Sequence, residues 1–144
     1  MSDTKQNKAP VWFMIVAAVL LVWNAMGVMA YIQQVTMGPE ALAALSGAQR
    51  QVLENTPAWA TAAFAVAVHG GVLGCLLLLL KKNLAGLLLQ LSLAGVALQM
   101  FHAYFISNSF EVFGPGAIMP IMVIVIAVYL VSLAAKAKAN RWTT

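Results

Sequence analysis

Four apolar runs of about 20 residues, each without Asp, Glu, Lys or Arg, most constrain what this chain can fold into. They cover residues 11–32, 58–80, 84–106 and 117–135. A helix needs roughly 20 mostly apolar residues to cross the hydrocarbon core of a bilayer. Helices are the expected form, because open strands would leave backbone groups unpaired in hydrocarbon. The sequence therefore predicts an all-α membrane protein, with residues 1–144 forming one domain, a bundle of four transmembrane helices.

Composition agrees with a surface that faces lipid. Of the 144 residues, 62% are hydrophobic and only 8% are charged, whereas soluble domains have about 25% charged residues. The formal net charge of +4 could suggest a nucleic-acid partner. The basic residues, however, stand in short clusters between the apolar runs, which is the pattern of membrane topology. We therefore expect membrane lipid, and no nucleic acid, as the partner of this surface.

The distribution of Lys and Arg predicts the orientation. Seven of the eight basic residues precede the first run, separate the second from the third, or follow the fourth: Lys5, Lys8, Lys81, Lys82, Lys136, Lys138 and Arg141. The positive-inside rule then places both termini in the cytoplasm. Basic residues before an apolar run also suit a signal peptide, whose apolar core has about 7–15 residues. The first run is longer, so we expect a retained span.

The first outer loop, residues 35–57, is long enough to contain a helix of its own. Pro39 suits a first helical position, and Glu40 suits the positive end of a helix. A helix here would align four apolar side chains on one face: Leu42, Leu45, Val52 and Leu53. The sequence predicts an amphipathic helix within residues 39–54, lying flat on the outer membrane surface.

Polar side chains inside the apolar runs are the candidate site residues, because hydrocarbon offers them no water. With a rise of about 1.5 Å per residue, Asn24, His69 and Gln99 all lie roughly 16–22 Å from the cytoplasmic side. His102 follows Gln99 by three residues and shares its helix face. We expect the first three to line a polar pocket, with His102 nearer its outer mouth. The alternative is that they only form interhelical hydrogen bonds, worth about 0.6–2 kcal/mol each.

The candidate residues do not suit a metal, a cofactor or catalysis. His69 and His102 differ by roughly 10 Å in depth, whereas the axial ligands of a haem face each other across one iron. No Cys, Asp or Glu joins the histidines, and the lone Cys75 cannot form an internal disulfide. The sequence also has no nucleophile with a base and no carboxylate pair. We therefore expect no metal, no cofactor and no enzymatic activity.

Small residues form a stripe along the second run, and Gly70, Gly71 and Gly74 are its glycines. Small residues let helix backbones approach closely, which drives association in lipid. Two uses of the stripe stay open. It can pack within the bundle, or it can form a homodimer through the second span.

Several short strings resemble one family of small bacterial four-span inner-membrane proteins, which often carry the loose label "sugar transporter". The strings are Trp23-Asn24-Ala-Met-Gly27-Val-Met-Ala-Tyr31, Gly38-Pro39-Glu40, Pro57-Ala58-Trp59, Gly71-x-x-Gly74-Cys75-Leu76 and Phe110-Glu111-Val112. The resemblance covers nearly the whole chain and implies a bacterial inner membrane, without supplying a mechanism or binding residues. We expect a non-catalytic protein that binds or transports a small neutral or lipid-like molecule. The alternative is a structural or accessory membrane subunit with no ligand of its own.

Overall fold

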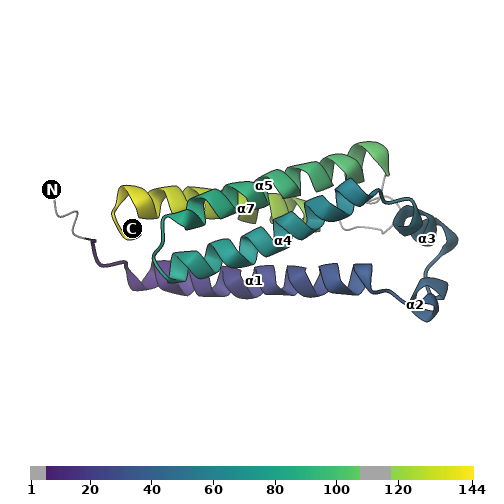
Figure 1. Ribbon diagram of the computed structural model, residues 1–144, viewed down its shortest axis with the longest axis horizontal. Coiled ribbons are helices and arrows are strands. Elements are labelled where there is room, and N and C mark those ends of the chain that lie inside the picture. The colour runs from purple at the N-terminus through teal and green to yellow at the C-terminus, as the bar shows by residue number, and fades with distance from the viewer. Residues whose placement is uncertain (1–5, 108–117) are drawn as a thin grey trace.

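A computed structural model describes residues 6–107 and 118–144 (Figure 1). Within this part the chain is helical, without strands: α1 (Val11–Val35), α2 (Pro39–Ala43), α3 (Gly47–Glu54), α4 (Ala58–Leu79), α5 (Leu84–Phe101), the π-helix η1 (His102–Ile106) and α7 (Ile118–Ala139). Lys5, the Phe110-Glu111-Val112 string and the predicted start of the fourth span at residue 117 lie outside the described residues.

Four helices in the described part are long and apolar enough to cross a membrane: α1, α4, α5 with η1, and α7. They coincide with the four apolar runs, so the prediction of four long apolar helices is confirmed. The first helix continues to Val35 and the last to Ala139, each somewhat beyond its predicted end. This architecture is that of a multi-pass membrane protein.

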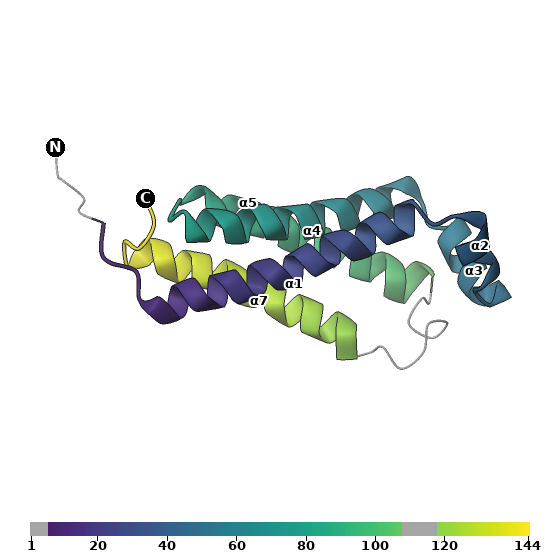
Figure 2. The ribbon, with the colours of Figure 1, turned by 90° about the horizontal axis from the view of Figure 1, so that it is seen from below.

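Both ends of the described chain lie at the same end of the bundle (Figures 1 and 2). The backbone N–H of Asn7 donates to the carbonyl of Arg141 at 2.8 Å. Thr144 is bonded to the α4–α5 turn, donating its N–H to Lys81 and accepting from Asn83, both at 2.9 Å. We call this the basic end, because Lys8, Lys81, Lys82, Lys136, Lys138 and Arg141 all belong to it. The opposite end, which carries α2 and α3, we call the loop end.

Two helices finish at the basic end with the same backbone motif. Lys81 after α4 and Arg141 after α7 both have φ of 59°. In each case the following residue bonds back across the last turn, Lys82 to Leu77 at 2.9 Å and Trp142 to Ala137 at 2.8 Å. This Schellman pattern pairs carbonyls that a helix end would otherwise leave unsatisfied.

Packing is tight at the basic end and looser toward the loop end. α4 packs between α1 and α5, and α7 packs on α5. At the basic end Phe13 of α1 is fully buried, with its ring centroid 5.3 Å from that of Trp142, which follows α7. α1 and α7 then diverge toward the loop end (Figure 2). The bundle is therefore closed at the basic end and splayed at the other.

The glycine stripe of α4 packs inside the chain. A Cβ on Gly70 would lie 3.2 Å from the carbonyl oxygen of Leu88, and one on Gly74 would lie 2.5 Å from the side chain of Leu89. A Cβ on Gly71 would overlap Asn24 of α1. These three glycines therefore allow α4 to approach α5 and α1, which is the first of the two predicted uses.

Gly95 of α5 makes the closest approach to a neighbouring backbone, and the candidate packing residues did not include it. A Cβ there would lie 2.7 Å from the carbonyl oxygen of Ala63 and 2.8 Å from the amide nitrogen of Ala67. The α4–α5 hairpin is thus held close by small residues on both helices.

The first outer loop contains two short helices where one was predicted. Ser46 separates α2 from α3: its hydroxyl accepts from the N–H of Gln49, and the Gln49 side chain accepts from the N–H of Ser46, both at 3.2 Å. This capping box starts a new helix and so ends the previous one. Arg50 joins the two, since its Nε donates to the carbonyl of Leu42 at 3.2 Å. The flat placement on a membrane surface stays a prediction.

Candidate functional site

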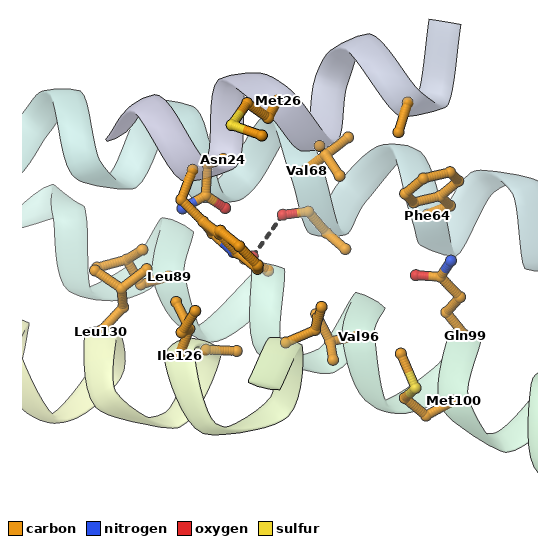
Figure 3. Close-up of a pocket in the computed structure, with 17 residues that line it drawn as sticks. Asn24, Met26, Phe64, Val68, Leu89, Val96, Gln99, Met100, Ile126 and Leu130 are labelled. Carbon is orange, nitrogen blue, oxygen red and sulfur yellow. Dashed lines mark hydrogen bonds between the residues drawn. The ribbon is translucent and has the colours of Figure 1, made fainter. Parts of the chain in front are cut away.

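A cavity of about 390 Å³ lies in the splayed part of the bundle, between α1, α4, α5 and α7. We call it the inner cavity (Figure 3). Most of its wall is apolar, with side chains such as Met26, Phe64, Val96, Met100 and Ile126. Its polar side chains come from two helices: Trp23 and Asn24 from α1, and Ser92 and Gln99 from α5, with no polar side chain from α4 or α7.

The inner cavity is open along α1. The lining residues Ala67, Val96 and Ala127, from α4, α5 and α7, are all buried. On α1, by contrast, Met26 is 62% exposed and Ala30 is also exposed. Both residues lie within α1 (Val11–Val35) rather than at its termini, so the open side faces the flank of the bundle.

Asn24 is fixed in the wall of the inner cavity. Its Nδ2 donates to the carbonyl of Leu20 at 2.8 Å and lies 3.7 Å from the Sγ of Cys75. Its side chain occupies the space that Gly71 leaves open. The Asn24 amide therefore joins α1 to α4, as an interhelical hydrogen-bonding residue would.

Gln99 also lines the inner cavity, but at the other end from Asn24 (Figure 3). It lies beside Phe64 and Met100. Its amide forms no hydrogen bond with another residue in the described part of the chain. The two predicted residues share a cavity without meeting, and Gln99 is the one whose polar atoms stay free to bind.

His69 does not line the inner cavity, so the structure does not bring it together with Asn24 and Gln99 as predicted. It is exposed on α4, its Nδ1 bonds to the carbonyl of Ala65 at 2.7 Å, and its ring meets that of Tyr31 edge-on at 5.5 Å. Helix geometry explains the error. With about 3.6 residues per turn, placing Gly70 against α5 and Gly71 against α1 turns residue 69 outward.

Ser92 was not among the predicted site residues, although it lines the inner cavity. It is buried, and its hydroxyl donates to the carbonyl of Ala67 at 2.6 Å. The bond crosses from α5 to α4 and uses the donor of Ser92. Ser92 thus contributes to the hairpin rather than to ligand contacts.

A second cavity of about 420 Å³ adjoins the first at the loop end, and we call it the outer cavity. Ala30, Phe64, Gln99 and Met100 line both cavities. The loop containing α2 and α3 contributes Leu45, Val52 and Leu53 to the outer cavity, so it covers this end of the bundle. The polar lining is richer than in the inner cavity: Gln33, Gln34, Thr56, Gln99 and His102.

His102 is the buried polar residue of the outer cavity. It is 6% exposed, and its ring meets Trp59 edge-on with centroids 5.4 Å apart. It opens the π-turn η1, which Ser107 closes by donating its N–H to the carbonyl of His102 at 2.9 Å. This wider turn leaves two successive residues, His102 and Ala103, both buried. Such turns are frequent at functional sites.

Within the described residues, no three His, Cys, Asp or Glu side chains gather into a metal-binding group. No protein-family model, curated protein or solved structure matches this chain. The resemblance to small four-span inner-membrane proteins therefore stays a prediction.

Proposed function

We propose that this chain is a non-catalytic protein of a bacterial inner membrane that binds or transports a small neutral or lipid-like molecule through the inner cavity. The observation that carries the proposal is the cavity itself, an apolar space of about 390 Å³ open along α1. Ligand pockets in proteins commonly measure about 300–1,000 Å³. A membrane would place hydrocarbon directly at the open side.

The apolar wall favours a guest that is already dissolved in the bilayer. Atoms that line an empty apolar space lose van der Waals contacts on that side. An alkyl chain entering beside Met26 would restore those contacts without leaving an apolar solvent. The free amide of Gln99 would add a hydrogen bond where the inner cavity meets the outer cavity.

The basic end supports an orientation with both termini in the cytoplasm. Six of the described basic residues belong to that end, and the positive-inside rule associates such clusters with the cytoplasmic face. In this orientation α2, α3 and the outer cavity face the outside, and the inner cavity opens into the outer part of the membrane.

A photoactivatable alkane carrying a diazirine tests the binding proposal. In nanodiscs of phosphatidylcholine, its cross-links should concentrate on lining residues such as Met100 and Val123, and unlabelled alkane should compete. Ala30→Phe should reduce this labelling, because residue 30 lines both cavities. Ala25→Phe is the matched control, since Ala25 is exposed on the same helix and lines neither. Labelling confined to outward residues such as Val19 and Leu73 would refute the proposal.

The second candidate, an accessory subunit or a homodimer through the second span, is favoured by His69. Since its Nδ1 is bonded to Ala65, the Nε2 points to the exposed side of α4, and an unpaired polar atom in hydrocarbon costs a few kcal/mol. His69 stands in an exposed stripe whose spacing alternates between three and four residues, suited to a second helix: Trp59, Ala62, Val66, His69, Leu73, Leu76 and Leu80.

Disulfide trapping tests that candidate. In a Cys75→Ala background, Leu73→Cys should cross-link two copies under mild oxidation if the stripe forms a homodimer. Leu87→Cys, on an exposed face of α5, should not. Equal cross-linking at both positions would indicate random collision and would refute the dimer.

A further inference from the structure

The inner and outer cavities differ in how much hydrogen-bonding capacity they leave free. In the inner cavity, Asn24 already donates to Leu20 and Ser92 already donates to Ala67. The side-chain amide of Gln99, at the junction of the two cavities, has no hydrogen bond to any other described residue. The inner cavity thus offers mainly apolar contact, and the amide of Gln99 is free where it meets the outer cavity.

The outer cavity keeps most of its polar atoms unbonded. The side chains of Gln33, Gln34 and His102 form no hydrogen bonds with described residues, whereas the Thr56 hydroxyl donates to the carbonyl of Val52 at 2.7 Å. No side-chain nitrogen or oxygen in the described part is both fully buried and unpaired. The side-chain nitrogens of His102 are therefore not fully enclosed, although the residue is only 6% exposed, and His102 lines the outer cavity.

Neither cavity is lined by a charged side chain. The nearest basic group along the covering loop, Arg50, turns its Nε to the carbonyl of Leu42 instead. A charged ligand group here would lose water without gaining a counter-charge, which is costly. An uncharged group that both donates and accepts hydrogen bonds suits amide and imidazole side chains, and a hydroxyl does both.

We propose that the ligand is a single-chain amphiphile with an uncharged, hydroxyl-bearing head group. The head binds in the outer cavity against His102 and Gln99, and the alkyl tail lies in the inner cavity and leaves along α1. This inference rests on the proposed binding function and adds the ligand's chemical class and its direction. Trp59 contributes by holding the His102 ring edge-on, so that the imidazole is preset for the head group.

Competition against the photoactivatable alkane tests the head group. The full chain is reconstituted in phosphatidylcholine nanodiscs and challenged with four molecules of equal chain length: a monoacylglycerol, a plain alkane, a fatty acid and an alkyltrimethylammonium. The monoacylglycerol should compete at about tenfold lower concentration than the alkane, the effect of roughly one to two net hydrogen bonds. The two charged amphiphiles should compete no better than the alkane.

Two histidine variants supply the matched comparison. His102→Leu should remove the advantage of the monoacylglycerol and leave competition by the alkane unchanged. His69→Leu should leave both unchanged, because His69 lines neither cavity. If His102→Leu fails to fold, Gln34→Leu at the half-buried wall of the outer cavity should reduce the same advantage.

Each outcome decides between the two proposals. Equal competition by the monoacylglycerol and the alkane would overturn the head-group inference and leave binding in the inner cavity intact. Stronger competition by the fatty acid or the ammonium would overturn the uncharged head group. An advantage that survives both His102→Leu and Gln34→Leu would place the head elsewhere and overturn the inference. Absence of any competable labelling in the cavity would overturn the proposed function, and the inference with it.

Discussion

Among single residues, Gly71 and Asn24 form a pair in which one supplies the space that the other fills. A methyl group at residue 71 would overlap the Oδ1 of Asn24. Gly71→Ala should therefore lower the free energy of unfolding by about 1–3 kcal/mol, the range for overpacking a tight site. Thermal unfolding in detergent measures it. In an Asn24→Ala background most of this cost should disappear, because neighbouring substitutions are not additive.

Gly86 of α5 is the control for that pair, since a Cβ there would meet no atom within 4 Å. Gly86→Ala should be neutral or stabilise by about 0.5–1 kcal/mol through helix propensity. Equal losses at residues 71 and 86 would show that the overlap with Asn24 does not limit stability.

Sequence reasoning predicted the depth of the polar residues but not the direction in which they point. Asn24, Gln99 and His102 line the cavities, whereas His69 does not. Depth follows from counting residues at a fixed rise. Direction depends on which helix faces which, and in a uniformly apolar helix no hydrophobic periodicity marks the buried face. In α4 the glycines do indicate the buried face, because Gly70 and Gly71, next to His69, lie on the packed side.

Among elements, the α4–α5 hairpin depends on backbone contact at Gly95. The neighbours of an added Cβ would be backbone atoms of Ala63 and Ala67, at 2.7 and 2.8 Å, whereas at Gly74 the neighbour is the side chain of Leu89, which can change its rotamer. Gly95→Ala should therefore cost more than Gly74→Ala, with both near 1–3 kcal/mol. Unfolding midpoints of the two variants decide this. A larger loss at Gly74 would contradict the backbone argument.

The covering helix α3 depends on its capping box. Ser46→Ala removes the hydroxyl that accepts from Gln49, at a cost of about 1 kcal/mol to the helix. Amide hydrogen exchange should become faster in residues 47–54 and stay unchanged in α4 and α5. Gln51→Ala, at an exposed position of the same helix, is the control. The Ser-x-x-Gln spacing of a capping box is present in the sequence, so the start of a second helix in the loop was predictable from it.

For the whole molecule, the apolar runs predicted the four long helices because the bilayer fixes their length. The divergence of α1 and α7, which creates the inner cavity, had no such signature. It arises from packing along the whole length of the helices. At the basic end Phe13 of α1 contacts Trp142, whereas near the loop end no equivalent contact joins α1 to α7 among the described residues. The presence of a cavity between helices thus depends on the summed volumes of many side chains, which no single sequence motif predicts.

The final prediction concerns which face of the membrane each end of the molecule occupies. Basic residues gather at one end, so Lys82→Cys should resist an impermeant thiol reagent in intact cells and react after lysis. Glu54→Cys, exposed at the loop end, should react in both conditions. A Cys75→Ser background removes the lone native thiol, which is buried in any case. If Lys82→Cys is labelled in intact cells and Glu54→Cys is not, the molecule is inverted. The outer cavity would then face the cytoplasm, and an amphiphile would enter it head-first from that side.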